Sequence, residues 1–332
     1  MTTIALSKFC EMFPPIDACA VSDTQCLLLL SQPPDPNLPQ RQSALVLVDH
    51  STGKALVLGE FPGVSELVLW FRMTAQGVHA LVSSPGGRLW ELRIDKTVTQ
   101  IDNAFGDDGP DLYGYLTCCV QHGGFVYVGG MGNQLYRTPL HQARFERADN
   151  TFLDQDMIDD DAAIYGLADL GSEALLGVGG GGMILSIQGK QSRRLDSGTN
   201  VMINAVCALD SEVFVACGTG GLLLHGSIRG WCKAAEKNPL ENFFSDVRVQ
   251  GDQLLWIGGQ KLYESTVGDG WSELVRVPGA PAASRFARGG TSTWSVNSKH
   301  LGWTSDGRQW TWLPTDSIGV EESGSTVRRP VK

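Results

Sequence analysis

No apolar run in the sequence is long enough to cross a membrane. The longest, "ALLGVGGGGMILSI" at 174–187, is shorter than the roughly 18 residues of a membrane helix and is interrupted by glycine. The N-terminal stretch "MTTIALSKFCEMFPP" has one lysine, no sustained apolar core and no small-residue cleavage site, unlike a secretory signal. We therefore expect a soluble chain without membrane spans, located in the cytoplasm.

The chain also lacks the cysteine spacings of metal and redox sites. Its eight cysteines include no C-x-x-C pair, and most lie inside apolar strand-like runs. We expect them to be buried thiols and expect no metal or cofactor. A cross-strand bridge between Cys207 and Cys217 is expected only if the protein is exported.

Common catalytic motifs are missing as well. No G-x-S-x-G, P-loop or H-E-x-x-H occurs, and the six histidines lie far apart in the sequence. A literal G-x-G-x-x-G at Gly177, Gly179 and Gly182 continues into the strand-like "MILSIQG" rather than into a helix, so it predicts a turn and no nucleotide site. These absences argue against an enzyme.

The sequence is rich in glycine, with 40 residues placed mostly between short apolar runs. A strand-like run, a small-residue turn and a second strand-like run recur in six segments. They are "VHALVSSPGGRLWEL" from Val78, "FVYVGGMGNQLYR" from Phe125, "ALLGVGGGGMILSI" from Ala174, "VFVACGTGGLLLHG" from Val213, "LLWIGGQKLYES" from Leu254 and "STWSVNSKHLGWTS" from Ser292. Their turns lie 38 to 50 residues apart, close to the roughly 40 to 50 residues of a four-stranded propeller blade.

Each repeat has room for an inner, two middle and one outer strand. An apolar strand precedes the pair, and a more polar one follows in the better repeats. Six units begin near Glu66, Asp111, Ala162, Met202, Phe243 and Ser284, and the N-terminal region supplies a seventh. We predict an all-β fold, a seven-bladed β-propeller, although six or eight blades also fit. The repeats form a single domain over 1–315, with a proline-rich insertion at 31–40, and the polar tail 316–332 is expected to be disordered.

One turn carries a family resemblance. The segment "WTSDGRQWTWL" at 303–313 resembles the Asp-box, Ser/Thr-x-Asp-x-Gly-x-x-Trp, of sialidase-like propellers and of photosystem II assembly-factor propellers. Thr304, Asp306, Gly307 and Trp310 carry the match, with one spacer residue fewer between Asp and Gly, and degenerate copies precede Trp231 and Trp271. The resemblance covers about a third of the chain and implies a turn closed by the aspartate, with the tryptophan packed between strands. It supports the fold; the arginine triad and nucleophilic tyrosine of a sialidase find no match.

Negative charge is concentrated in two segments. "DNAFGDDGPD" at 102–111 has four carboxylates, "DNTFLDQDMIDDD" at 149–161 has six, and neither contains lysine or arginine. The chain has 36 acidic and 26 basic residues, so setting these ten aside leaves 26 of each sign. Both segments precede a Tyr-Gly pair at the start of a repeat, so both are predicted to join one blade's outer strand to the next blade's inner strand. We expect them to form one acidic patch at one mouth of the ring.

Three interpretations of this patch are open: solvated loops that aid solubility, a surface for a basic partner, and a Ca²⁺ site in the second segment. We favour a basic protein partner, and disfavour nucleic acid because its phosphates would be repelled. The candidate partner-binding residues are Asp102, Asp107, Asp108, Asp111, Tyr113, Asp154, Asp156, Asp159, Asp160 and Asp161, with Tyr115, Phe105 and Phe152 as further aromatic anchors.

The predicted function is that of a non-catalytic binding platform that occludes or scaffolds a basic protein. One version is a bacterial immunity-type inhibitor of a toxin or effector. The alternatives are a sialidase-like or lyase-like glycan-active enzyme that uses the central channel, and an assembly factor for a larger complex. The sequence leaves the oligomeric state open.

Overall fold

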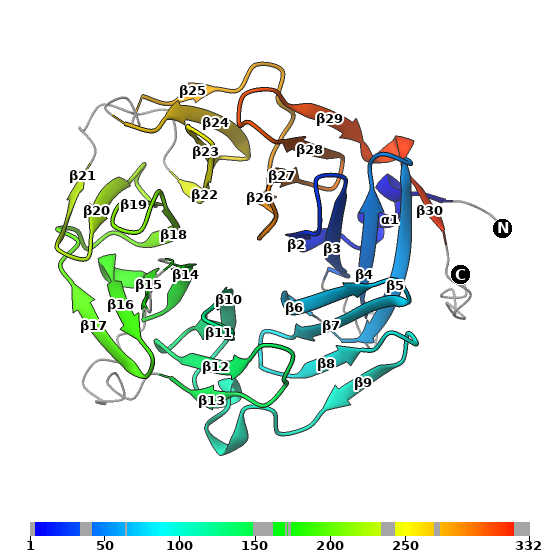
Figure 1. The fold of residues 1–332 in the computed structure, drawn as a ribbon, viewed down its shortest axis with the longest axis horizontal. Coiled ribbons are helices and arrows are strands. Elements are labelled where there is room, and N and C mark those ends of the chain that lie inside the picture. The colour runs from blue at the N-terminus through cyan, green and yellow to red at the C-terminus, as the bar shows by residue number, and fades with distance from the viewer. Residues whose placement is uncertain are drawn as a thin grey trace.

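The short apolar runs of the sequence form β-strands, and these strands close into a ring of seven sheets in the computed structural model (Figure 1). The structure describes residues 4–33, 42–63, 65–148, 162–169, 171, 174–233, 243–268 and 273–321. Within this described part, no helix is long and apolar enough to span a bilayer. The prediction of a seven-bladed β-propeller is therefore confirmed.

Blades two to seven each consist of four strands that follow one another in sequence. Blade two contains β6 (Leu67–Thr74), β7 (Gly77–Ser83), β8 (Leu89–Leu92) and β9 (Val98–Ile101); blade three β10 (Leu116–His122), β11 (Phe125–Gly130), β12 (Leu135–Pro139) and β13 (Glu146–Arg147); blade four β14 (Ile164–Asp169), β15 (Ala174–Gly179), β16 (Ile184–Gln188) and β17 (Gln191–Leu195). Blade five contains β18 (Ile203–Ala208), β19 (Phe214–Gly218), β20 (Leu223–Ser227) and β21 (Gly230–Lys233); blade six β22 (Phe244–Gln250), β23 (Gln253–Gly258), β24 (Lys261–Thr266) and β25 (Val275–Arg276); blade seven β26 (Arg285–Phe286), β27 (Thr293–Val296), β28 (His300–Thr304) and β29 (Thr311–Pro314).

Blade one is extended by both ends of the chain. It contains β2 (Pro15–Ala20), β3 (Gln25–Ser31), β4 (Gln42–Asp49) and β5 (Lys54–Pro62), and β30 (Gly319–Glu321) pairs with β5 in parallel. The strand β1 (Ile4–Ala5) pairs with β30 and leads into the helix α1 (Leu6–Met12). The first and last described residues, Ile4 and Glu321, therefore belong to the sheet of blade one (Figure 1).

This arrangement corrects the predicted tail. Residues 316–321, assigned to a disordered tail, form part of the 3-10 helix η5 (Thr315–Ser317) and the strand β30. The reason is tertiary: Ile318 and Val320 are buried in the core of blade one, where β5 offers a free sheet edge. The predicted insertion at 31–40 starts inside β3, since Ser31 is the last residue of that strand, and most of it lies outside the described residues.

The hydrophobic core lies between neighbouring blades. In one such layer, Leu69 and Trp70 of blade two pack with Leu116 and Val126 of blade three. The inner strands of blades one to six share a register shift near the start of the strand, which is a β-bulge. Each inner strand stands at one end of its sheet, so it is an edge strand, and it faces the central channel.

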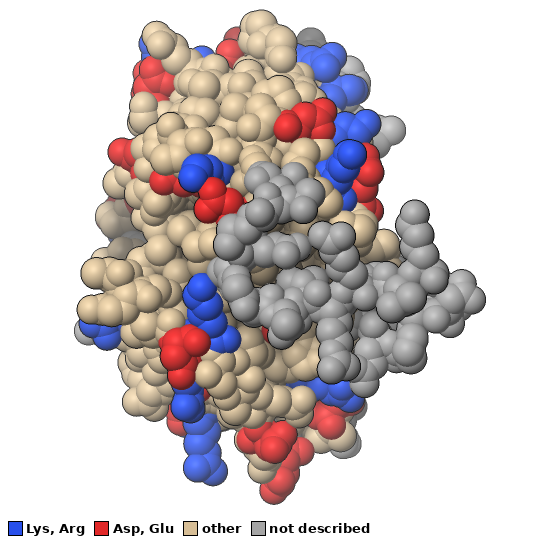
Figure 2. All heavy atoms as spheres, turned by 90° about the vertical axis from the view of Figure 1, so that its right-hand side faces the viewer, with Lys and Arg blue, Asp and Glu red and all other residues tan. Residues whose placement is uncertain are grey.

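Strand alternation gives the ring two different faces. The loop that joins an outer strand to the next inner strand emerges on the same face as the turns between second and third strands, and we call this the upper face. Hydrogen bonds confirm the proximity: Leu116 N–H donates to Pro85 O at 2.8 Å, and Gly132 N–H to Ala162 O at 2.6 Å. On the side of blade one, the described basic and acidic residues that are visible lie interspersed (Figure 2).

Candidate functional site

The first acidic segment forms a loop on the upper face between β9 and β10. We call residues 102–115 the acidic loop; it contains the 3-10 helices η1 (Gly106–Asp108) and η2 (Pro110–Leu112). Packing holds both halves of the loop in place. Phe105 stacks on Phe145 at 4.6 Å between ring centroids, and Pro110 packs so tightly on Gly87 that a Cβ there would lie 2.7 Å from its ring.

The position of Phe105 corrects one sequence prediction. Phe105 is only 8% exposed and belongs to the core between blades two and three, so it is not a surface anchor. The backbone explains this difference, because Ala104 accepts a hydrogen bond from Phe145 N–H at 2.8 Å and so turns the following ring inward. Phe105 fixes the loop and leaves recognition to its neighbours.

The carboxylates of the acidic loop face solvent. Asp102, Asp107 and Asp111 are exposed, and no described basic side chain forms an ion pair with any of them. Asp102 accepts one hydrogen bond, from Gln100 Nε2 at 3.1 Å. The backbone of Asp108 ends η1, and its side chain lies outside what the structure describes. The loop therefore presents uncompensated negative charge.

Apolar side chains accompany these charges. Leu112 is 63% exposed, Tyr115 60% and Met131 39%, which are high values for large hydrophobic residues. Met131 lies beside the loop, because its N–H donates to Tyr115 O at 2.8 Å. We call Leu112, Tyr115 and Met131 the apolar patch. Tyr113, a predicted binding residue, is half-buried, with the Arg147 guanidinium 4.3 Å above its ring, and its role in binding stays a prediction.

The second acidic segment, 149–161, is located only by the described residues on either side of it. Asp154, Asp156, Asp159, Asp160, Asp161 and Phe152 lie outside the described residues. On one side of the segment, Arg147 contacts Tyr113 of the acidic loop. On the other side, Ala162 O accepts the hydrogen bond from Gly132 N–H, next to Met131. The segment therefore leaves and re-enters the described fold close to the acidic loop, and the merged patch stays a prediction.

A groove of about 860 Å³ runs along the other side of the acidic loop, over blade two. Its walls are the loop itself, the 84–88 turn and the connection that ends at Glu66. Three carboxylates line it, from Glu66, Asp102 and Asp111, against one guanidinium, from Arg88. Partial burial raises the pKa of the Glu66 carboxyl, and the charge of Arg285 opposes that rise.

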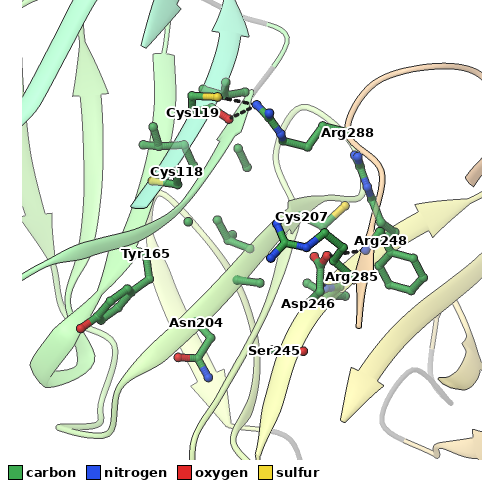
Figure 3. Close-up of a pocket in the computed structure, with 18 of the residues that line it drawn as sticks. Cys118, Cys119, Tyr165, Asn204, Cys207, Ser245, Asp246, Arg248, Arg285 and Arg288 are labelled. Atoms are coloured by element: carbon green, nitrogen blue, oxygen red, sulfur yellow. Dashed lines mark hydrogen bonds between the residues drawn. The ribbon is translucent and has the colours of Figure 1, made fainter. Parts of the chain in front are cut away.

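The central channel holds a second cluster of charged residues, which the sequence reasoning missed. A cavity of about 540 Å³ is lined by all seven inner strands. Figure 3 shows part of this lining, including Asp246, Arg248 and Arg288. Its charged lining residues include Asp17, Asp246, Arg248, Arg285 and Arg288. Lone charges inside apolar strands, as in "PIDACA" and "FSDVRV", were the available sequence signal.

Most of these side chains bond to backbone groups of neighbouring blades. Asp17 accepts a hydrogen bond from Val68 N–H of blade two at 2.8 Å, and Asp246 accepts one from Phe286 N–H of blade seven at 2.9 Å. Arg248 donates to Ala287 O of blade seven. Since inner strands expose unpaired backbone groups, these side chains satisfy them and tie blade to blade.

Arg288 makes the longest connection. From blade seven it donates to the Asp17 carboxylate of blade one, to Val68 O of blade two at 2.7 Å, and to Cys119 Sγ of blade three. Asp17 is only 4% exposed, whereas the Arg288 side chain is 30% exposed, so the pair is partly shielded from water. Arg288 thus braces four blades and fills part of the channel.

The ionisation of the channel groups gives little support to catalysis. Burial raises the pKa of the Cys19 and Cys119 thiols to about 12, with Arg288 opposing the rise, so neither is a ready thiolate nucleophile. Burial also raises the pKa of Asp246, and Arg248 opposes that rise. Every cysteine is a free thiol. Among the described residues, no three His, Cys, Asp or Glu side chains are grouped as metal ligands.

Comparisons with known proteins agree with the ring fold. No protein-family model matches the chain. The chain is 26% identical over 212 residues to the Immune protein Tsi7 of Pseudomonas aeruginosa, a match that covers 62% of this chain and 66% of that protein, just under two thirds of its length. Two solved structures share the fold: virginiamycin B lyase from Staphylococcus aureus (9% identity, 94% and 98% of the two chains, TM-score 0.60) and YCF48 bound to D1 peptide (18% identity, 76% and 82%, TM-score 0.54).

Proposed function

We propose that this protein is a non-catalytic binding propeller whose upper face docks on a basic protein partner and occludes or scaffolds it. One observation carries the proposal: the acidic loop presents exposed carboxylates without described ion pairs beside the exposed apolar patch. Some acidic side chains elsewhere on the described surface form ion pairs, as Glu146 does with Arg137 at 2.8 Å and with Lys190 at 2.9 Å, while others, such as Asp95, Asp210 and Glu212, form none with described residues; the adjacent apolar patch therefore distinguishes the acidic loop.

Charge and apolar area would act at different steps of binding. Unpaired carboxylates raise the rate of encounter with a positively charged protein, and they add little affinity individually. Large apolar side chains supply the affinity when they are buried at the centre of an interface. Tyr115 and Leu112 are suited to this role because packing of Phe105 and Pro110 already holds the loop, so less conformational entropy is lost on binding.

The likeness to an immune protein supports a more specific form of the proposal. The chain would be a bacterial, cytoplasmic, immunity-type inhibitor that covers a basic toxin or effector. Support comes from the 26% identity to Tsi7 over 212 residues, a match that covers 66% of that protein. An assembly factor, the related alternative, would use the same face to bind a different partner. The likeness to YCF48 shows a shared fold and supports this alternative no further.

A channel enzyme is the weaker alternative. It would need arginines and carboxylates that are free to contact a substrate, whereas Arg248, Arg288, Asp17 and Asp246 are bonded to neighbouring blades. The likeness to virginiamycin B lyase, at 9% identity, supports the fold alone.

Affinity capture from the native host tests the proposal. The parent would be compared with a variant in which Asp102, Asp107 and Asp111 are changed to Asn. The matched control changes Asp95, Asp210 and Glu212, exposed acids on the opposite face, to Asn, Asn and Gln. We expect the parent and the control to retain a basic protein that the loop variant loses. Equal recovery by all three would reject the acidic loop as the docking surface.

A further inference from the structure

The groove beside the acidic loop overlaps the apolar patch only at Tyr115. It lies over blade two, whereas Met131 belongs to blade three, and its volume of about 860 Å³ is large enough for several residues of an extended chain. The groove has a fixed shape, because the loop is tied to the 84–88 turn by the Leu116 to Pro85 hydrogen bond at 2.8 Å. The contact between Pro110 and Gly87 holds the same wall.

The charges of the groove favour a cation. Glu66, Asp102 and Asp111 line it and are all exposed, while Arg88 is its single described positive charge. No described basic side chain forms an ion pair with any of the three carboxylates. Desolvation raises the pKa of the Glu66 carboxyl, and a guanidinium or ammonium group entering the groove would oppose that rise, as the charge of Arg285 does.

Trp90 gives an independent indication of what else the occupant contains. Its side chain borders the groove although it is only 2% exposed, and its indole Nε1–H donates to no described acceptor. A buried N–H without an acceptor is energetically unfavourable. Its benzene ring lies against Gly63 in the groove wall, where a Cβ would be 3.6 Å from Cζ2. A peptide carbonyl that reaches this edge of the ring from the groove would satisfy the indole.

We propose that this groove receives an extended peptide segment carrying arginine or lysine, contributed by the basic partner. The side chain would lie among Glu66, Asp102 and Asp111, its aliphatic part against Tyr115 at the rim, and a backbone carbonyl of the segment would accept from Trp90. This inference rests on the proposed function and specifies which part of the partner enters the protein.

The test follows the Trp90 indole N–H by NMR in the ¹⁵N-labelled full chain, with the resonance assigned by Trp90→Phe. The probes are a capped Gly-Arg-Gly-Arg-Gly peptide, the same peptide with glutamate in place of arginine, and calcium chloride. The variant combines Glu66→Gln, Asp102→Asn and Asp111→Asn. The control is Asp95→Asn, an exposed aspartate at the other end of blade two. Dispersed spectra establish that both variants fold.

We expect the arginine peptide alone to shift the Trp90 resonance in the parent and the control, with a midpoint about tenfold higher in the triple variant. An unmoved resonance, equal midpoints in parent and triple variant, or a shift by calcium without one by peptide would overturn the inference. Partner capture separates the two proposals. If the parent captures a basic partner but its Trp90 resonance does not respond to the peptide, only the groove inference is overturned. If the peptide binds but no partner is captured, the proposed function is overturned.

Discussion

Buried charges in this protein hold the ring together. Asp17 and Arg288 are 271 residues apart in sequence, yet they form an ion pair that joins the first blade to the last. No local pattern could have predicted their contact, because it exists only once the ring has closed. The sequence did show unusual charges in apolar strands, but it gave no information about which partner each would meet.

We expect Arg288→Gln to lower the free energy of unfolding by about 3 kcal/mol, since it leaves the buried Asp17 carboxylate only the 3.8 Å ion pair with Arg285 among the described residues. Asp17→Asn should lower it by less, because the Arg288 side chain is 30% exposed and keeps its hydrogen bond to Val68 O. Replacing both at once, by Asp17→Leu and Arg288→Met, should be less destabilising than the sum of the single changes. Urea denaturation measures these differences. Arg93→Gln, which removes an exposed pair with Glu91, should change stability by less than about 1 kcal/mol. If the single variants lower the free energy of unfolding as little as Arg93→Gln does, the contact between Asp17 and Arg288 does not stabilise the ring.

The turn between β28 and β29 gives a prediction of pH dependence. Asp306 accepts hydrogen bonds from Gln309 N–H at 2.8 Å and Arg308 N–H at 2.9 Å, as the resemblance implied for the aspartate. These bonds lower the pKa of Asp306 in the folded state. The unfolded carboxyl then binds a proton more readily, so the charge stabilises the fold above the ordinary pKa of about 3.9, and this contribution is lost as pH falls through the folded pKa.

The stability difference between the parent and Asp306→Asn should therefore be larger at pH 7 than at pH 3. Urea unfolding at both pH values measures it. A difference that stays constant with pH would contradict this account of the turn.

At the scale of elements, the sequence predicted the repeating units well. Blades two to seven begin within a few residues of the predicted starts; for example, β6 begins at Leu67 and β22 at Phe244. The apolar pairs around small-residue turns carry this information locally. The inner strand β2 was missed because Pro15 and Asp17 interrupt its apolar character. The strand β30 was missed because its polar sequence becomes a strand only against the edge of β5.

The pairing of β30 with β5 predicts that substitutions of buried residues in β30 lower the stability of the protein. Val320 is 1% exposed within the core of blade one, so Val320→Asp should destabilise the protein by more than about 3 kcal/mol. The adjacent Glu321→Gln breaks only the exposed pair with Lys54 and should have an effect below about 1 kcal/mol. Thermal unfolding compares the two. Equal melting temperatures would mean that β30 does not stabilise the ring.

At the scale of the whole molecule, the charge distribution connects the fold to the proposed function. The propeller topology places the acidic loop on the same face as the second-to-third strand turns, and the flanks of the second acidic segment reach that region through Arg147 and Ala162. Sequence spacing predicted the loop's place between blades two and three. It did not predict the groove or the buried position of Phe105, because both depend on contacts between blades.

Hydrogen exchange of the complex with its captured basic partner tests the central claim most directly. Amides of residues 106–115 and 84–88 would be compared in the free and bound protein. We expect slower exchange in these two segments on binding, with residues 93–97 and 251–252 on the opposite face unchanged. Protection confined to the opposite face, with the acidic loop exchanging as in the free protein, would contradict the account.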